Sequence, residues 1–182
     1  MSKWLIASDI HGDATCAGRL LERYRESGAE RLILLGDLLY HGPRNELPAG
    51  YAPKKVISLL NGVKNELFCV RGNCDAEVDQ MVLQFPIMAD YAWLCADGLN
   101  FFATHGHHFH LDALPPLRRG DILLHGHTHV PVAQRFGEDN WYVNPGSVSI
   151  PKENSPRSCI LYENRTVTFF DLFGDAYREI RI

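Results

Sequence analysis

The sequence has few cysteines, no long apolar run and no excess of basic residues, and each absence excludes a class of protein. Its five cysteines are an odd number and none forms a C-x-x-C pair, which argues against a disulfide framework and a thiolate zinc site. No run of about 18 apolar residues occurs, so no membrane span is expected. The net charge of −4 argues against stable binding to nucleic acid, which needs a basic surface.

The N-terminal residues do not predict a signal peptide, because the apolar stretch before Asp9 is too short. A reducing cytoplasm is therefore the expected location. The 182 residues, 46% hydrophobic and 22% charged, have the size and composition of one globular domain spanning residues 1–182. No internal repeat or low-complexity tract interrupts it.

The hydrophobic pattern predicts an α/β fold. In the first half, buried strands at residues 4–8, 32–35 and 67–70 alternate with a helix that Asp13 caps and a helix that begins near Pro53. This order implies parallel pairing. The second half predicts strands with short connections, at residues 93–94, 99–104, 122–124, 141–143, 158–162 and 167–171. These favour a second, more antiparallel sheet, and so a sandwich of two packed mixed β-sheets flanked by α-helices.

Residue types that bind metals follow five of the predicted strands. They are Asp9 and His11, Asp37, Asn73, His105, and His127 with His129. Ligand sites in α/β sheets form beyond the carboxyl ends of strands, so these side chains are expected to share one site. Side chains two apart on an extended segment point the same way. The pairs Asp9–His11 and His127–His129 are therefore each expected to reach that site together.

The donor types constrain the metal. Carboxylate, imidazole and amide oxygen suit Mn, Fe, Co or catalytic Zn better than a structural zinc site, and no thiolate is among them. Seven ligands are too many for one tetrahedral ion, so two divalent ions are expected. One carboxylate must then bridge them, and Asp37 is the candidate.

These motifs resemble the calcineurin-like metallophosphoesterase superfamily, and more narrowly its YfcE-type family of small bacterial phosphodiesterases. The resemblance rests on Asp9-Ile10-His11, Gly36-Asp37, Gly72-Asn73-Cys74-Asp75, Thr104-His105-Gly106-His107, Gly126-His127-Thr128-His129 and Asn144-Pro145-Gly146-Ser147. It implies a metallophosphoesterase-like sandwich with two metal ions, often manganese, with Zn, Fe, Co and Mg as alternatives. By the same resemblance, Asp9, His11 and His129 hold the first ion, Asp37 bridges, and Asn73, His105 and His127 hold the second. His107 is the alternative to His105.

The hypothesis for function is a metal-dependent phosphodiesterase, which hydrolyses a small phosphodiester through attack of a hydroxide that bridges the two metals. A phosphomonoesterase or a nucleotide pyrophosphatase remains an alternative. A non-catalytic protein-binding scaffold of the same fold is a further one, but such scaffolds usually lose a histidine that this chain keeps. No G-x-S-x-G elbow occurs, which argues against a serine hydrolase.

The candidate catalytic residues are Asp37, Asn73, Cys74 and Asp75. Many members of the superfamily have histidine where Cys74 stands, and cysteine is a poor acid at neutral pH, so the source of the leaving-group proton stays open. Asp75 is a candidate for orienting a metal ligand. The long loop at residues 41–53 offers His41 and Arg44 as contacts for substrate phosphate, and could also bind another subunit.

Overall fold

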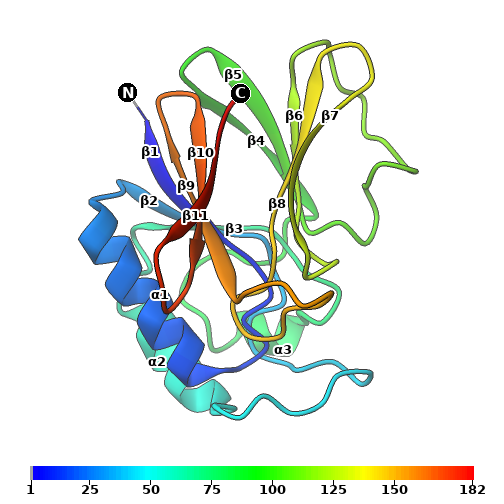
Figure 1. Ribbon diagram of the computed structural model, residues 1–182. Helices are drawn as coiled ribbons and strands as arrows, with labels where there is room; N and C mark the ends of the chain where they lie inside the picture. The colour runs from blue at the N-terminus through cyan, green and yellow to red at the C-terminus, as the bar shows by residue number, and fades with distance from the viewer. Residues whose placement is uncertain (1) are drawn as a thin grey trace.

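Residues 2–182 of the computed structural model form two β-sheets packed face to face (Figure 1). The first sheet has the strand order β11 (Ala176–Arg181), β10 (Thr166–Asp171), β9 (Ser158–Glu163), β1 (Lys3–Ala7), β2 (Arg31–Leu34) and β3 (Leu67–Cys69). The second has the order β4 (Tyr91–Ala96), β5 (Leu99–Thr104), β6 (Ile122–Leu124), β8 (Asn140–Pro145) and β7 (Pro131–Phe136). Both sheets are mixed, as the sequence predicts.

The membership of the sheets differs from the sequence prediction. Strands β1, β2 and β3 are parallel neighbours, as expected. The last strands do not join the second sheet, however, because β9 pairs antiparallel with β1 and carries β10 and β11 with it. This pairing satisfies the backbone of β1 on its second edge, where an otherwise buried strand would leave polar groups without partners.

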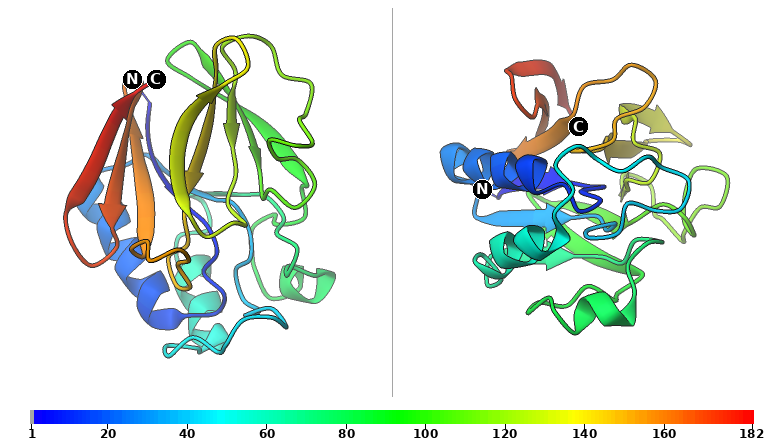
Figure 2. Two further views of the ribbon diagram at one scale, coloured as in Figure 1. Left: turned by 45° about the vertical axis from the view of Figure 1, so that its right-hand side comes forward. Right: turned by 90° about the horizontal axis from the view of Figure 1, so that it is seen from below.

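Two helices cover the outer face of the first sheet (Figure 2). Helix α1 (Ala14–Ser27) begins at Asp13, whose carboxylate accepts the backbone N–H of Cys16 at 2.9 Å, and ends at Gly28, whose φ of 65° suits glycine. Helix α2 (Pro53–Asn61) begins with proline. The short helix α3 (Glu77–Gln80) was not predicted. The outer face of the second sheet is covered by residues of the 106–120 segment, so helices flank one sheet only.

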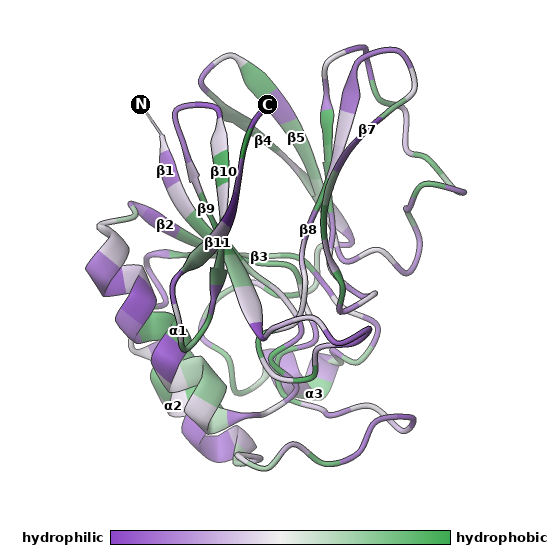
Figure 3. Ribbon diagram, viewed as in Figure 1, coloured by the Kyte–Doolittle hydropathy of each residue, from purple (hydrophilic) through white to green (hydrophobic). Residues whose placement is uncertain are grey.

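Alternate residues of β1 explain its continuous apolar run. Leu5 and Ala7 pack toward the helices, whereas Trp4 and Ile6 pack toward the second sheet. Figure 3 shows this hydrophobic character where the strands converge, and more hydrophilic residues on the helices. The strand is therefore buried on both faces.

The parallel strands of both sheets end at the same edge of the molecule. In Figure 1 this edge lies at the bottom with the 41–52 loop, and the two termini lie at the top. Loops that follow β1, β2, β3, β5 and β6 therefore meet there. Among residues 2–182, no helix has the length and hydropathy to cross a membrane.

Candidate metal centre

Asp9, His11 and His129 form one cluster at this edge. Asp9 Oδ1 lies 3.5 Å from His11 Nε2 and 3.3 Å from His129 Nε2, and the two imidazole nitrogens are 3.3 Å apart. All three side chains are buried. The structure thus brings together the three residues predicted to hold the first ion.

A second cluster lies beside the first and contains Asn73, His105 and His127. His105 Nε2 is 3.0 Å from Asn73 Oδ1 and 3.2 Å from His127 Nδ1. Asp37 lies between the clusters, with Oδ2 at 3.7 Å from His11 Nε2 and 3.4 Å from His105 Nε2. Its carboxylate therefore reaches both groups of side chains.

The backbone reaches this arrangement in a way that the sequence did not predict. Asp9, His11, Asp37, His127 and His129 all have positive φ, between 47° and 65°, so these segments turn sharply and are not extended. The turn sends His127 and His129 to different clusters, and the prediction that they reach the site as an extended pair is wrong. Left-handed backbone at non-glycine residues is costly and is typical of functional sites.

Two glycines allow the loops after β2 and β3 to approach each other. A side chain on Gly72 would collide with the carboxylate and backbone nitrogen of Asp37, and one on Gly36, whose φ is 94°, would collide with the backbone of Gly72. The Gly-Asp and Gly-Asn pairs of the sequence are thus a requirement of close packing. They place Asp37 next to Asn73.

Backbone carbonyls orient three of the imidazoles. His11 Nδ1 lies 2.8 Å from Tyr40 O, His105 Nδ1 lies 2.6 Å from Leu35 O, and His129 Nδ1 lies 2.6 Å from Ile150 O. Because a carbonyl only accepts, each Nδ1 carries a proton and each Nε2 faces the centre, where its lone pair is available to a metal ion once Nε2 is deprotonated. The three imidazole rings are therefore already oriented for metal binding.

Asp75 holds the loops and does not touch the centre. Its carboxylate accepts the backbone N–H groups of Asp37 at 2.8 Å, Leu38 at 2.9 Å and Gly72 at 2.7 Å. Burial raises the pKa of Asp75, and these donors act in the opposite direction. Asp75 is buried and does not line the cavity described below, so it acts as a positioning residue.

The charges of the clustered groups depend strongly on one another. Burial alone would raise the pKa of Asp9, but the facing imidazoles of His11, His129 and His105 hold it well below its usual range. Burial lowers the pKa of His105, yet its bond to Asp37 and the charges of Asp9 and Asp37 raise it to about 9. The centre therefore favours a positive charge beside its carboxylates.

These residues fit divalent cations. Asp9 Oδ1 is buried and makes no hydrogen bond to residues 2–182, although three imidazole nitrogens surround it within 4.0 Å. A cation satisfies such an oxygen and the facing nitrogen lone pairs together. Asp9, Asp37 and His105 also offer ligand atoms close enough to share one ion, as do Asp9, His11 and His129.

His105 enters the cluster and His107 does not. The His105 ring is fully buried, whereas the His107 ring lies 5.4 Å from it, centroid to centroid, and packs on His108 at 4.0 Å. Among the described residues, no hydrogen bond joins His107 to Asn73 or His127. The geometry thus distinguishes two histidines that the sequence could not separate.

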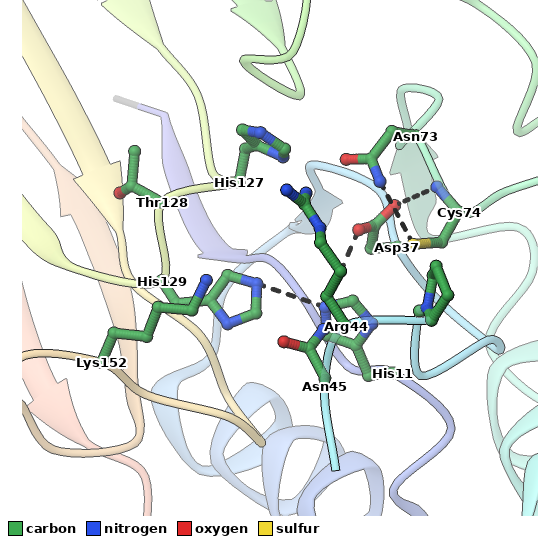
Figure 4. A pocket seen from close by; sticks show the side chains of 12 residues that line it. His11, Asp37, Arg44, Asn45, Asn73, Cys74, His127, Thr128, His129 and Lys152 are labelled. Atoms are coloured by element: carbon green, nitrogen blue, oxygen red, sulfur yellow. Dashed lines mark hydrogen bonds and ion pairs between the residues drawn. The ribbon is translucent and has the colours of Figure 1, made fainter. Parts of the chain in front are cut away.

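A cavity of about 500 Å³ opens over the centre (Figure 4). Arg44, Cys74, His127 and Lys152 are among its lining residues. Burial and the nearby Asp37 raise the pKa of the Cys74 thiol to about 12, so it holds its proton at neutral pH. His41, a predicted substrate contact, does not line the cavity.

His41 instead packs beside aromatic rings of its own loop region. Its ring centroid lies 4.7 Å from that of Tyr40 and 5.4 Å from that of Tyr51. Lys152, which no pattern in the sequence indicates, enters the cavity because residues 147–155 fold over His129. The backbone N–H of Lys152 donates to the carbonyl of His129 at 3.2 Å.

Residues 144–149 support the centre from beneath. The hydroxyls of Ser147 and Ser149 donate to the carbonyl of Asp9 at 2.8 and 2.9 Å. The Asn144-to-Ser147 motif of the sequence therefore lies next to Asp9. They hold a backbone turn and contribute no side chain to the cavity.

The two-sheet sandwich and the Asp, His and Asn centre at its edge define a calcineurin-like phosphoesterase. The chain matches that superfamily's domain over residues 3–166 and belongs to it. Membership implies divalent metal ions as cofactors. Over 172 residues the chain is 49% identical to phosphodiesterase YfcE of Escherichia coli K12, covering 94% of this chain and 93% of the relative.

Other relatives are more distant. Phosphodiesterase MJ0936 of Methanocaldococcus jannaschii is 25% identical over 149 residues, covering 78% of this chain and 81% of the relative. Among solved structures, the YfcE phosphoesterase of E. coli superposes with a TM-score of 0.95 at 46% identity, covering 99% of each chain. Vps29 of Entamoeba histolytica with Zn²⁺ superposes with a TM-score of 0.64 at 18% identity, covering 98% of each chain, which shows the fold alone.

Proposed function

We propose that this protein is a cytoplasmic phosphodiesterase that hydrolyses small phosphodiesters at a centre of two divalent ions, with manganese as the working metal. The observation that carries the proposal is the convergence of seven candidate ligands into two clusters that share Asp37. Its membership of the phosphoesterase superfamily and its similarity to named phosphodiesterases support the proposal. Carboxylate, imidazole and amide donors suit manganese.

The ligand sets follow from the clusters. Asp9, His11 and His129 would hold one ion, Asn73, His105 and His127 the other, and Asp37 both. Two divalent ions carry more positive charge than Asp9 and Asp37 neutralise, so the centre attracts a phosphodiester anion despite the acidic chain. When bound, such ions lower the pKa of water into the neutral range and withdraw charge from the phosphoryl group.

Arg44 and Lys152 bind the substrate phosphate in this proposal. They come from different loops, and Figure 4 shows both side chains reaching into the cavity, Arg44 toward His127 and Lys152 beside His129. Neither forms an ion pair within residues 2–182, so both charges are free to meet an anion. Arginine can donate two parallel hydrogen bonds to a phosphate.

The leaving group receives little help from Cys74. Its thiol has a pKa of about 12, far above neutral pH, and is a weak donor, so it is a poor general acid for a departing alkoxide. We therefore expect the enzyme to prefer esters whose leaving alcohol is acidic. Cys74 contributes instead through its backbone N–H, which donates to Asp37 Oδ1 at 2.8 Å and fixes that carboxylate.

The test is a metal-dependence assay. Metal-stripped protein is supplied with Mn, Mg, Zn or Co and assayed on bis-p-nitrophenyl phosphate and on p-nitrophenyl phosphate, beside the variants Asp37→Ala and His127→Ala. Asp139, which pairs with Arg119 and Arg135 between β7 and β8 and does not line the cavity, gives the matched control Asp139→Ala. The wild-type protein and the control should cleave the diester, fastest with Mn. Asp37→Ala and His127→Ala should not cleave it.

Other outcomes select the alternatives. Faster cleavage of the monoester than of the diester would make the protein a phosphomonoesterase. No turnover with any metal, from folded protein that binds the ions, would contradict the proposal and favour a protein-binding scaffold.

A further inference from the structure

A second cavity, of about 390 Å³, lies beside the metal centre. His127 and Thr128 line both cavities, so they form a shared wall. The second cavity extends over the outer face of the second sheet, and the rest of its lining is Gly106, His107, His110, Leu111, Asp112, His125 and Tyr142. A ligand whose phosphate sits at the centre can therefore place one of its arms there.

Two aromatic residues lie at the floor of this cavity. The rings of His125 and Tyr142 stack on each other, with centroids 4.7 Å apart and an angle of 28° between their planes, and both residues are buried, so little of either ring faces the cavity. Leu111 forms an apolar side wall, because it packs against the small core of Phe102, Leu123 and Tyr142. An aliphatic wall beside ring atoms suits an apolar ring.

Two hydroxyl groups give this cavity a polar edge. The side-chain amide of Asn144 donates to Tyr142 Oη at 3.1 Å and to Thr128 Oγ1 at 2.9 Å. Because the amide has two protons and the Gly126 carbonyl accepts one of them, the two hydroxyls share the other. Asn144 is itself buried and also donates to the carbonyl of Gly126 at 2.8 Å, which fixes its orientation.

The charge of the lining differs between the cavities. The cavity over the centre has Arg44 and Lys152, whereas the second has no lysine or arginine among its described lining residues and has Asp112 at its rim. An anionic group would meet no counter-charge there. The arm that the second cavity accepts is therefore not anionic.

We propose that the second cavity binds an uncharged aromatic ring carried by one ester arm of the substrate, and so selects aryl or heteroaryl phosphodiesters. This inference rests on the proposed function, because it assumes that the phosphoryl group binds at the metal centre. The ring lies against Leu111, beside His125 and Tyr142.

The test measures binding without turnover. Calorimetric titration of the manganese-loaded protein with phenylphosphonate and methylphosphonate compares a phosphoryl group with and without a ring. Phenylphosphonate should bind about tenfold more tightly than methylphosphonate, because burial of part of the surface of one ring stabilises the complex by about that factor. In Leu111→Trp, whose larger side chain fills the cavity, this preference should fall to about twofold or less.

Leu114→Trp is the matched control, because Leu114 lies on the same segment, is exposed and does not line the cavity. It should keep the tenfold preference. Leu111→Ala, which removes the side wall, serves if the larger substitution prevents folding, and should also weaken the preference.

Equal binding of the two phosphonates to the wild-type protein, or an unchanged preference in both Leu111 variants, would overturn the inference. Failure of the proposed function is a separate result, since it would appear as ring-selective binding without hydrolysis of any diester.

Discussion

Replacement of Asp75 by asparagine tests how the centre is held. In the wild-type protein Oδ2 accepts two backbone N–H groups, from Asp37 and Gly72, and Oδ1 accepts one, from Leu38. An asparagine amide has only one acceptor oxygen, so either orientation of its amide sets an N–H against at least one of these donors. At least one of the three hydrogen bonds to the charged carboxylate is therefore lost, and the remaining bonds have a neutral amide oxygen as their acceptor.

The magnitude follows from these bonds. A buried hydrogen bond to a charged group contributes about 1.5–3 kcal/mol and a neutral one about 1 kcal/mol, so Asp75→Asn should lower the free energy of unfolding by about 4 kcal/mol. For a chain of 182 residues this corresponds to a fall of roughly 10 °C in melting temperature. Because the loop of Asp37 loosens as well, metal affinity should fall about 10- to 100-fold.

Urea unfolding of metal-free protein measures the first effect and metal titration the second. Asp79→Asn is the control, since Asp79 accepts a single backbone N–H, from Ala76 at 2.9 Å, and the change should cost less than about 1 kcal/mol. An Asp75→Asn protein whose stability lies within about 1 kcal/mol of the wild type would refute the assignment of Asp75 as the group that fixes these loops.

Four further substitutions separate the roles of neighbouring side chains. Asp37→Ala should release most of the bound metal, measured by elemental analysis, and lower diester hydrolysis at least about 100-fold, because both clusters lose their shared carboxylate; full metal content would contradict a bridging role. His105→Ala should lose metal whereas His107→Ala should keep it, since only His105 contacts Asn73; the reverse result would exchange their roles. Cys74→Ser should leave the rate of diester hydrolysis at neutral pH within about threefold, because a thiol with a pKa of about 12 carries no proton-transfer step there; a tenfold loss would show that the thiol acts directly.

Much of the centre could be predicted because its residues follow apolar runs. A buried strand is visible as a short hydrophobic run, and ligands at the ends of parallel strands must meet at one edge of a sheet. This reasoning selects Asp9, Asp37 and Asn73 correctly as neighbours. It could not predict the left-handed backbone at Asp9 or His129, since surrounding loops impose that conformation.

The elements missed by the sequence analysis lack a hydrophobic pattern. Strand β11 is exposed at almost every position and β7 shows no clean alternation, so neither carries a periodic signal. Lys152 was missed for a different reason. Its place in the cavity depends on how residues 147–155 fold over His129, a tertiary relation that no local spacing records.

The antiparallel pairing of β1 with β9 has a consequence for how the chain folds. Lys3 lies opposite Glu163, so β1 leaves the ribosome long before its partner and keeps one open edge until residues 158–163 have been made. Such distant pairing makes the search for the native topology slow, and a half-finished sheet exposes a hydrophobic strand with unpaired backbone. Nascent chains of this protein should therefore depend on chaperones until residues 158–163 have emerged.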